Sequence, residues 1–120
     1  MIEDNVTQQK SYTFAIRIVK AYKYLSSHGE YVLSKQLLRS GTAVGALLRE
    51  SIHAQSRADF LNKMNIALKE AYETEYWISL LHDTDYLSDD VYSSIHADSV
   101  ELVRLLTSTV KTLKDSLGRQ

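Results

Sequence analysis

Cysteine and proline are absent from this 120-residue sequence, and glycine occurs only four times. Without cysteine the chain has no disulfide, no thiolate zinc site and no cysteine nucleophile, and a reducing compartment such as the cytoplasm fits best. Without proline and with so few glycines, helices can run long distances uninterrupted. These absences predict an all-α fold in a cytoplasmic protein.

Long apolar runs are missing as well. No stretch approaches the roughly 20 apolar residues that a membrane-spanning helix needs, and the first ten residues, MIEDNVTQQK, are polar. We therefore expect neither membrane insertion nor secretion. A chain of 120 residues with 24% charged and 44% hydrophobic residues can bury one core, so we expect a single domain over residues 1–120.

Capping residues and apolar periodicity divide the chain into four helices. Gly29 occupies the place of a left-handed C-terminal cap. Ser56 with Asp59 resembles a capping box, and Ser88 is placed to cap the last helix. The predicted helices cover residues 7–28, 30–54, 57–82 and 88–117. Their similar lengths and short connections predict an antiparallel up-and-down four-helix bundle.

The third predicted helix carries two apolar stripes. The main stripe contains Phe60, Leu61, Met64, Ala67, Leu68, Ala71, Tyr72 and Ile78. Ile66, Trp77 and Leu81 form a second, displaced stripe. A helix that is apolar on two sides needs a second partner, and another copy of the chain can supply it. We therefore predict a homo-oligomer with these three residues at its interface, the alternative being a single wider core.

Small residues interrupt the leucines of the second predicted helix at Ser40, Gly41, Ala43, Gly45 and Ala46. Each helical glycine costs about 1 kcal/mol relative to alanine, so a compensating gain is expected. Close approach of a neighbouring helix is the simplest gain. A phosphate-binding loop is the alternative, but RSGTAVGALLRES lacks the lysine-serine ending of such loops.

No set of residues in the sequence predicts catalysis or metal binding. Glu50 and His53 have the spacing of a di-iron bundle motif, but such sites need two copies and two further glutamates. Glu75 falls in phase with the main apolar stripe, so burial would require a partner such as Arg39 or a tyrosine hydroxyl. A structural ion pair or exposure at a helix edge is the favoured interpretation. We predict no catalytic residue, cofactor, metal or small-molecule substrate.

Charge is unevenly distributed along the chain. Residues 1–69 contain ten Lys/Arg and five Asp/Glu, whereas residues 70–120 contain four and ten. The first predicted helix has four basic residues and no acidic ones, which could follow a phosphate backbone. The candidate nucleic-acid contacts are Lys10, Arg17, Lys20 and Lys23, with Lys35 and Arg49 as further candidates. A solvated helix face is the competing interpretation, because nucleic-acid-binding domains are usually more basic than a pI of about 6.4.

The segment Leu33 to Leu81 resembles the 23S rRNA intervening-sequence protein family. The resemblance rests on the motifs QLLRSGTAVGA, SRADF and ALKEAYETEYW, and with the flanking helices it spans nearly the whole chain. It implies an antiparallel four-helix bundle, assembly as a ring-like homopentamer, and no enzymatic activity. A relative in this family, the accessory variability protein of diversity-generating retroelements, binds nucleic acid through a strongly basic surface.

The sequence thus favours a non-enzymatic, cytoplasmic homo-oligomer that acts as a binding or scaffold module. The alternative is an RNA-binding accessory protein linked to ribosomal RNA intervening sequences or to a retroelement.

Overall fold

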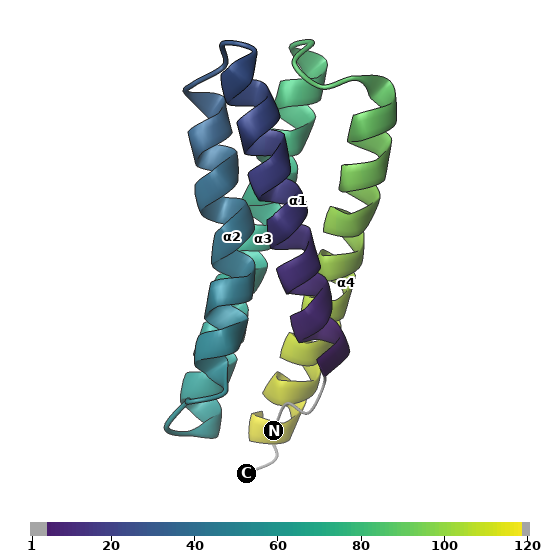
Figure 1. The fold of residues 1–120 in the computed structure, drawn as a ribbon. Coiled ribbons are helices and arrows are strands. Elements are labelled where there is room, and N and C mark those ends of the chain that lie inside the picture. The colour runs from purple at the N-terminus through teal and green to yellow at the C-terminus, as the bar shows by residue number, and fades with distance from the viewer. Residues whose placement is uncertain (1–4, 119–120) are drawn as a thin grey trace.

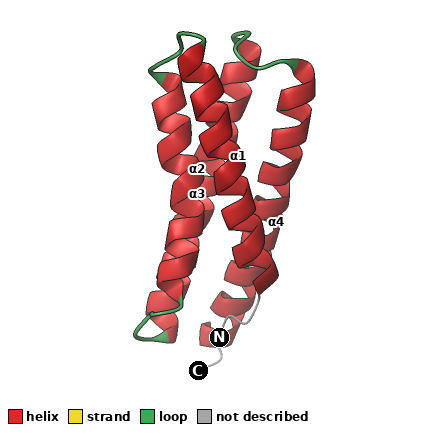
Figure 2. Ribbon diagram, viewed as in Figure 1, coloured by secondary structure: helices red, strands yellow, loops and turns green. Residues whose placement is uncertain are grey.

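The computed structural model describes residues 5–118, which contain four α-helices joined by short loops (Figure 2). The helices are α1 (Asn5–Ser27), α2 (Leu33–Ser51), α3 (Arg57–Asp83) and α4 (Asp89–Gly118). They form an elongated body of 51 × 21 × 21 Å. All four predicted helices are therefore present, and their bounds differ from the predicted ones mainly in α2.

The helices lie side by side along the long axis of the molecule. In the described part of the chain, α1 and α3 each pack against α2 and α4, and the contact between α1 and α4 is the least extensive. The α1–α2 and α3–α4 connections lie together at one end of the bundle (Figure 1). The α2–α3 connection lies at the other end, with the first turn of α1 and the last turn of α4.

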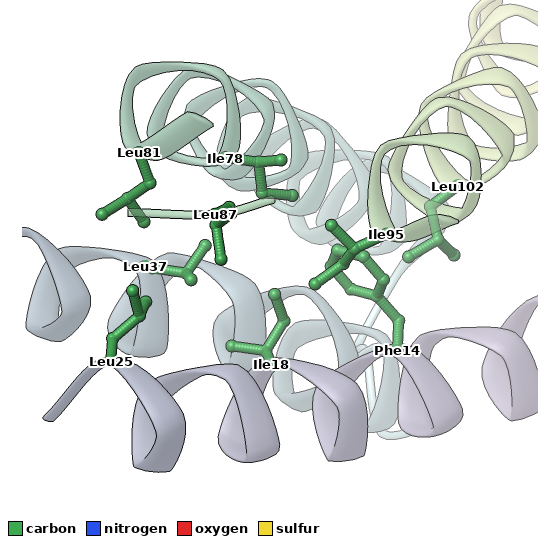
Figure 3. Close-up of a cluster of buried hydrophobic side chains, with 9 residues drawn as sticks. All are labelled: Phe14, Ile18, Leu25, Leu37, Ile78, Leu81, Leu87, Ile95 and Leu102. Carbon is green, nitrogen blue, oxygen red and sulfur yellow. The ribbon is translucent and has the colours of Figure 1, made fainter. Parts of the chain in front are cut away.

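The core consists of two clusters of buried apolar side chains stacked along the bundle. The first is nearer the α1–α2 and α3–α4 connections and contains Phe14, Ile18, Leu25, Leu37, Ile78, Leu81, Leu87, Ile95 and Leu102 (Figure 3). The second contains Val44, Leu48, Phe60, Met64, Ala67, Ala71, Leu106 and Val110. Full burial of one large aliphatic side chain stabilises a fold by about 1.5–3 kcal/mol, so these two clusters hold the four helices together.

The connection between α1 and α2 explains why α2 begins at Leu33 and not at the predicted Glu30. Gly29 has a φ of 90°, as predicted for a left-handed cap after α1. The Glu30 side chain then folds forward, and its carboxylate accepts hydrogen bonds from the backbone N–H groups of Leu33 at 3.0 Å and Ser34 at 2.6 Å. Glu30 therefore caps α2 from outside the helix, and only 6% of its surface is exposed.

The predicted serine caps are present at the starts of α3 and α4. The Ser56 hydroxyl accepts from the Asp59 N–H at 3.0 Å, and the Asp59 carboxylate accepts from the Gln55 N–H at 3.1 Å. The Ser88 hydroxyl accepts from the Val91 N–H at 3.2 Å. Such hydrogen bonds satisfy N–H groups that have no partner within the helix.

The small residues of α2 allow α1 to come close, as predicted, and Gly41 is the position that requires it. A Cβ atom at Gly41 would lie 2.7 and 2.8 Å from two side-chain carbons of the fully buried Ile18. At Gly45 a Cβ atom would lie 3.4 Å from its nearest neighbour, the Ser11 carbonyl oxygen, which is an ordinary contact. Gly41 therefore sets the distance between α1 and α2.

None of the helices in the described residues 5–118 is both long and apolar enough to cross a membrane.

Candidate interaction surfaces

The four basic residues of α1 divide into two groups, of which the first faces α4. Lys10 Nζ lies 3.1 Å from Glu101 Oε2, and Arg17 Nη1 lies 2.5 Å from Asp98 Oδ2. Arg17 also donates to the carbonyl and hydroxyl oxygens of Ser94. These two cations therefore join α1 to α4, and their charge is already balanced within the chain.

The second group is exposed near the α1–α2 connection. Lys20 and Lys23 lie in the last third of α1, and Lys35 lies in the first turn of α2. Arg49 lies near the other end of α2, with its guanidinium carbon 5.8 Å from the centre of the Tyr12 ring. The predicted nucleic-acid contacts therefore do not form one continuous track of free cations.

The predicted interface residues of α3 are placed very differently from one another. Leu81 is 0% exposed and belongs to the first core cluster, so its side chain cannot contact a second chain while the bundle is closed. Trp77 is half-buried and packs against the same cluster. Ile66 is also half-buried. The bundle's own core covers Leu81, and the interface prediction rests on Ile66 and Trp77.

Arg39 of α2 binds two glutamates of α3. Arg39 Nη1 lies 3.2 Å from Glu70 Oε1, and Arg39 Nη2 lies 2.5 Å from Glu73 Oε2. Trp77 Nε1 donates to Glu73 Oε2 at 2.9 Å. The hydrogen bond from Arg39 and the second from Trp77 lower the pKa of Glu73. This network fixes α2 against α3 and engages the polar edge of the indole.

Glu75 has a partner that the sequence did not indicate. Its carboxylate lies 3.0 Å from His96 Nε2 on α4, whereas Arg39, one of its predicted partners, is bound to Glu70 and Glu73. Glu75 is half-buried, in agreement with its position at the edge of the apolar stripe. The pair connects α3 to α4 and is a structural contact.

Two histidines and a tyrosine stack in the same seam between α3 and α4. The Tyr92 ring lies between His82, with centroids 4.1 Å apart, and His96, with centroids 5.0 Å apart. His82 Nε2 lies 2.7 Å from Asp89 Oδ1 and His82 Nδ1 lies 3.1 Å from Asp83 Oδ1. The hydrogen bond with Asp89 makes the largest contribution to raising the pKa of His82.

The residues considered for a metal site do not come together. Glu50 pairs with Lys63 at 3.2 Å, and His53 is exposed beyond the end of α2. Within residues 5–118 there is no group of three or more His, Asp or Glu side chains with the spacing of a metal site.

The described surface has shallow grooves of similar size between the helices. One of about 370 Å³ lies between α1 and α4 at the end with the α1–α2 connection, and another of about 400 Å³ lies between α1 and α2. The first is lined by Arg17, Lys20, Ala21, Tyr24, Leu87, Ser88, Val91 and Ile95. The second is lined by Gln8, Ser11, Tyr12, Ala15, Thr42, Gly45, Ala46 and Arg49. Both are open to solvent along one side of the bundle.

Acidic side chains gather around the α3–α4 connection, at the end of the bundle that also carries Lys20, Lys23 and Lys35. Asp83 ends α3, Asp85 lies in the connection with a φ of 70°, and Asp89 and Asp90 begin α4. All four are exposed. The sequence pattern predicted only a turn and the start of a helix over this segment. The excess of acidic residues after residue 69 was the available signal, but it did not locate the cluster.

Comparison with known proteins agrees with the fold and its motifs. The family model described as 23S rRNA-intervening sequence protein matches residues 3–108. A crystal structure of a protein with unknown function from the S23 ribosomal protein family of Bacteroides thetaiotaomicron VPI-5482 is 56% identical. The two superpose with a TM-score of 0.86, over 88% of this chain and 98% of that one. No curated protein matches the chain. Because the family model covers most of the sequence, this chain belongs to the 23S rRNA-intervening sequence protein family.

Proposed function

We propose that the chain is a subunit of a closed homo-oligomer, with five copies favoured, that acts in the cytoplasm as a non-enzymatic binding or scaffold module. Each subunit would be an antiparallel up-and-down bundle. The proposal rests on the amount of aromatic surface that stays exposed to solvent after the core of the bundle has formed. Six of the eight tyrosines expose 43–61% of their surface: Tyr12, Tyr24, Tyr31, Tyr72, Tyr76 and Tyr86.

Tyrosine on a surface favours association. Its ring supplies a large apolar contact while its hydroxyl still finds a hydrogen-bond partner, and aromatic residues are enriched where proteins meet. Half-buried Ile66 and Trp77 add apolar surface on α3. The resemblance to relatives that assemble as homopentamers favours other copies of the chain as the first partner.

The proposal of a non-enzymatic role is supported by the geometry of the polar groups. The ionisable side chains between helices are engaged in pairs that join one helix to another, such as Arg17 with Asp98 and Glu75 with His96. Catalysis by a general acid or base needs such a group aimed at a substrate in a recess. The grooves between these helices are open to solvent along one side, whereas ligand pockets usually enclose most of their ligand's surface.

The test is the mass of the native protein by size-exclusion chromatography with multi-angle light scattering. We expect a peak near five times the 13.7 kDa chain mass that persists on tenfold dilution from about 50 µM. A single peak at 13.7 kDa at every concentration would contradict the proposal. The absorbance ratio of the same peak at 260 and 280 nm reports any nucleic acid that co-purifies.

The second candidate is the RNA-binding accessory protein, linked to ribosomal RNA intervening sequences or a retroelement. It is favoured by the exposed lysines Lys20 and Lys23 beside Tyr24, which is 51% exposed and could stack on a base. A gel shift with structured RNA at low salt tests it. Binding should weaken in Lys20→Gln/Lys23→Gln and persist in the control Lys111→Gln/Lys114→Gln, whose lysines are exposed on α4. Absence of binding by the unmodified chain would contradict this candidate.

A further inference from the structure

Two exposed clusters of opposite charge lie at the same end of the bundle. The basic edge consists of Lys20, Lys23 and Lys35, which flank the α1–α2 connection. The acidic edge consists of Asp83, Asp85, Asp89 and Asp90, which flank the α3–α4 connection. Figure 1 shows both connections at one end, with the α1–α2 pair and the α3–α4 pair side by side.

The two edges remain after the chain has paired many of its other charges. Along the α1–α4 seam, Lys10 and Arg17 are bound to acidic residues of α4, and along the α2–α3 seam, Arg39 is bound to acidic residues of α3. Asp83 and Asp89 contact His82, yet their side chains stay 73% and 96% exposed. The acidic edge can therefore still pair with cations from outside the chain.

Exposed apolar side chains accompany both edges. Five of the eleven large apolar residues that the described surface exposes lie in these two connections or in the helix turns next to them. Tyr24, Tyr31 and Val32 lie beside the basic edge, at 51%, 61% and 71% exposure. Tyr86 and Val91 lie beside the acidic edge, at 43% and 46%. Val91 also lines the groove between α1 and α4, together with Lys20 and Tyr24. Each edge thus offers charge for orientation and apolar area for affinity, which is the composition of a protein interface.

We propose that the basic edge of one copy binds the acidic edge of the next copy, which makes the contact between subunits heterologous. This inference rests on the proposed homo-oligomer and identifies the surfaces that form it. Because both edges lie at the same end of the bundle, the contact holds successive copies with that end pointing the same way. Repetition of one heterologous contact closes into a ring when its rotation allows, and a ring of five is such an assembly.

Charge reversal tests the pairing directly. The first variant is Lys20→Glu/Lys23→Glu/Lys35→Glu, and the second is Asp83→Lys/Asp89→Lys/Asp90→Lys. Asp85 is left unchanged because of its positive φ. Each variant alone places like charges opposite each other, so we expect a monomer under conditions where the unmodified chain assembles. A chain with all six reversals has complementary edges again, and we expect it to recover the mass of the unmodified oligomer.

The matched control reverses three exposed lysines elsewhere, Lys69→Glu/Lys111→Glu/Lys114→Glu, and we expect it to keep the oligomer. Far-ultraviolet circular dichroism establishes that each variant is folded. If a reversed variant does not fold, disulfide crosslinking of the folded chain tests the same pairing. The chain has no cysteine of its own, so introduced cysteines can crosslink only with each other. Lys23→Cys/Asp90→Cys should then give a covalent ladder up to the full ring on oxidation, and each single cysteine at most a dimer.

The outcomes separate this inference from the proposed function. A monomeric unmodified chain would contradict both. Two results would overturn only the proposed pairing of edges. In the first, the unmodified chain is an oligomer and both reversed variants keep its mass. In the second, the chain with all six reversals folds but stays monomeric. The proposed pairing is also wrong if Lys20→Glu/Lys23→Glu/Lys35→Glu keeps the mass of the unmodified oligomer and loses RNA binding. The basic edge would then be a nucleic-acid surface.

Discussion

The stability of the α1–α2 connection should depend on Glu30 more than on any exposed glutamate. The Glu30 carboxylate accepts hydrogen bonds from the backbone N–H groups of Val32, Leu33 and Ser34 at 3.3, 3.0 and 2.6 Å. The Ser34 hydroxyl donates to the Glu30 carbonyl oxygen at 2.8 Å. Glu30→Ala would leave the first N–H groups of α2 without these partners at a position that is only 6% exposed.

Loss of a helix cap costs about 1 kcal/mol, and a buried N–H without a partner costs about 1–3 kcal/mol. Because water can reach part of the opened turn, we expect Glu30→Ala to lower the free energy of unfolding by about 2–3 kcal/mol. For a domain of this size that corresponds to a melting temperature lower by roughly 6–12 °C. Glu30→Gln keeps one acceptor oxygen and should cost about 1 kcal/mol.

The pH dependence of stability gives an independent test. Burial by itself would raise the pKa of Glu30, but the hydrogen bonds from the α2 backbone outweigh it and lower the pKa below 4.5. A carboxylate with a lowered folded pKa stabilises the fold above its unfolded pKa, and this contribution is lost as pH falls through the folded value. The stability difference between the unmodified chain and Glu30→Gln should therefore be constant from pH 6 to 8 and shrink in acid.

Both effects can be measured by urea unfolding followed by circular dichroism at several pH values. The control is Glu50→Ala, because Glu50 is 57% exposed in its pair with Lys63 and a surface ion pair contributes about 0–1 kcal/mol. If Glu30→Ala is no less stable than Glu50→Ala, or if the Glu30→Gln difference persists unchanged at pH 3, the capping argument is wrong.

Two further predictions concern helix contacts. Gly41→Ala should destabilise the fold by about 1–2 kcal/mol in urea unfolding, because the new Cβ would lie 2.7 Å from a side-chain carbon of Ile18. Gly45→Ala should be neutral or stabilising by up to about 1 kcal/mol, and the opposite order would refute the assignment of close approach. Asp89→Asn should lower the pKa of His82 toward the ordinary value for histidine, measured by NMR titration of the imidazole. Stabilisation by this pair is present below the unfolded pKa and is lost as pH rises through the raised one, and an unchanged pKa would show that Asp89 is not the cause.

Local features of the sequence predicted the helices well where the signal lies within one turn. The serines before α3 and α4 and the glycine after α1 act on neighbouring backbone groups, so their identity and spacing determine what they do. Glu30 was missed because a glutamate four residues before the N–H it caps is not a standard capping signal. That error placed the predicted start of the second helix three residues early.

Contacts between helices were not predictable to the same degree. Glu75 was expected near Arg39 or a tyrosine and instead pairs with His96, and Leu81 was assigned to a surface although it is fully buried. Each of these outcomes depends on the rotation of a helix about its axis and on its axial position against its neighbours. A shift of one residue rotates a side chain by about 100°, which is enough to move it from the core to the surface.

Residue patterns alone were enough to predict that the chain is helical, where its helices begin and end to within a few residues, and that its two halves differ in charge. The sequence also carried the family motifs along α2 and α3. The packing of the helices, by contrast, fixes which charges are paired within the bundle and which remain exposed at one end. Capping and periodicity act over a few residues of one chain segment, whereas pairing and burial depend on atoms that the fold brings together from distant segments.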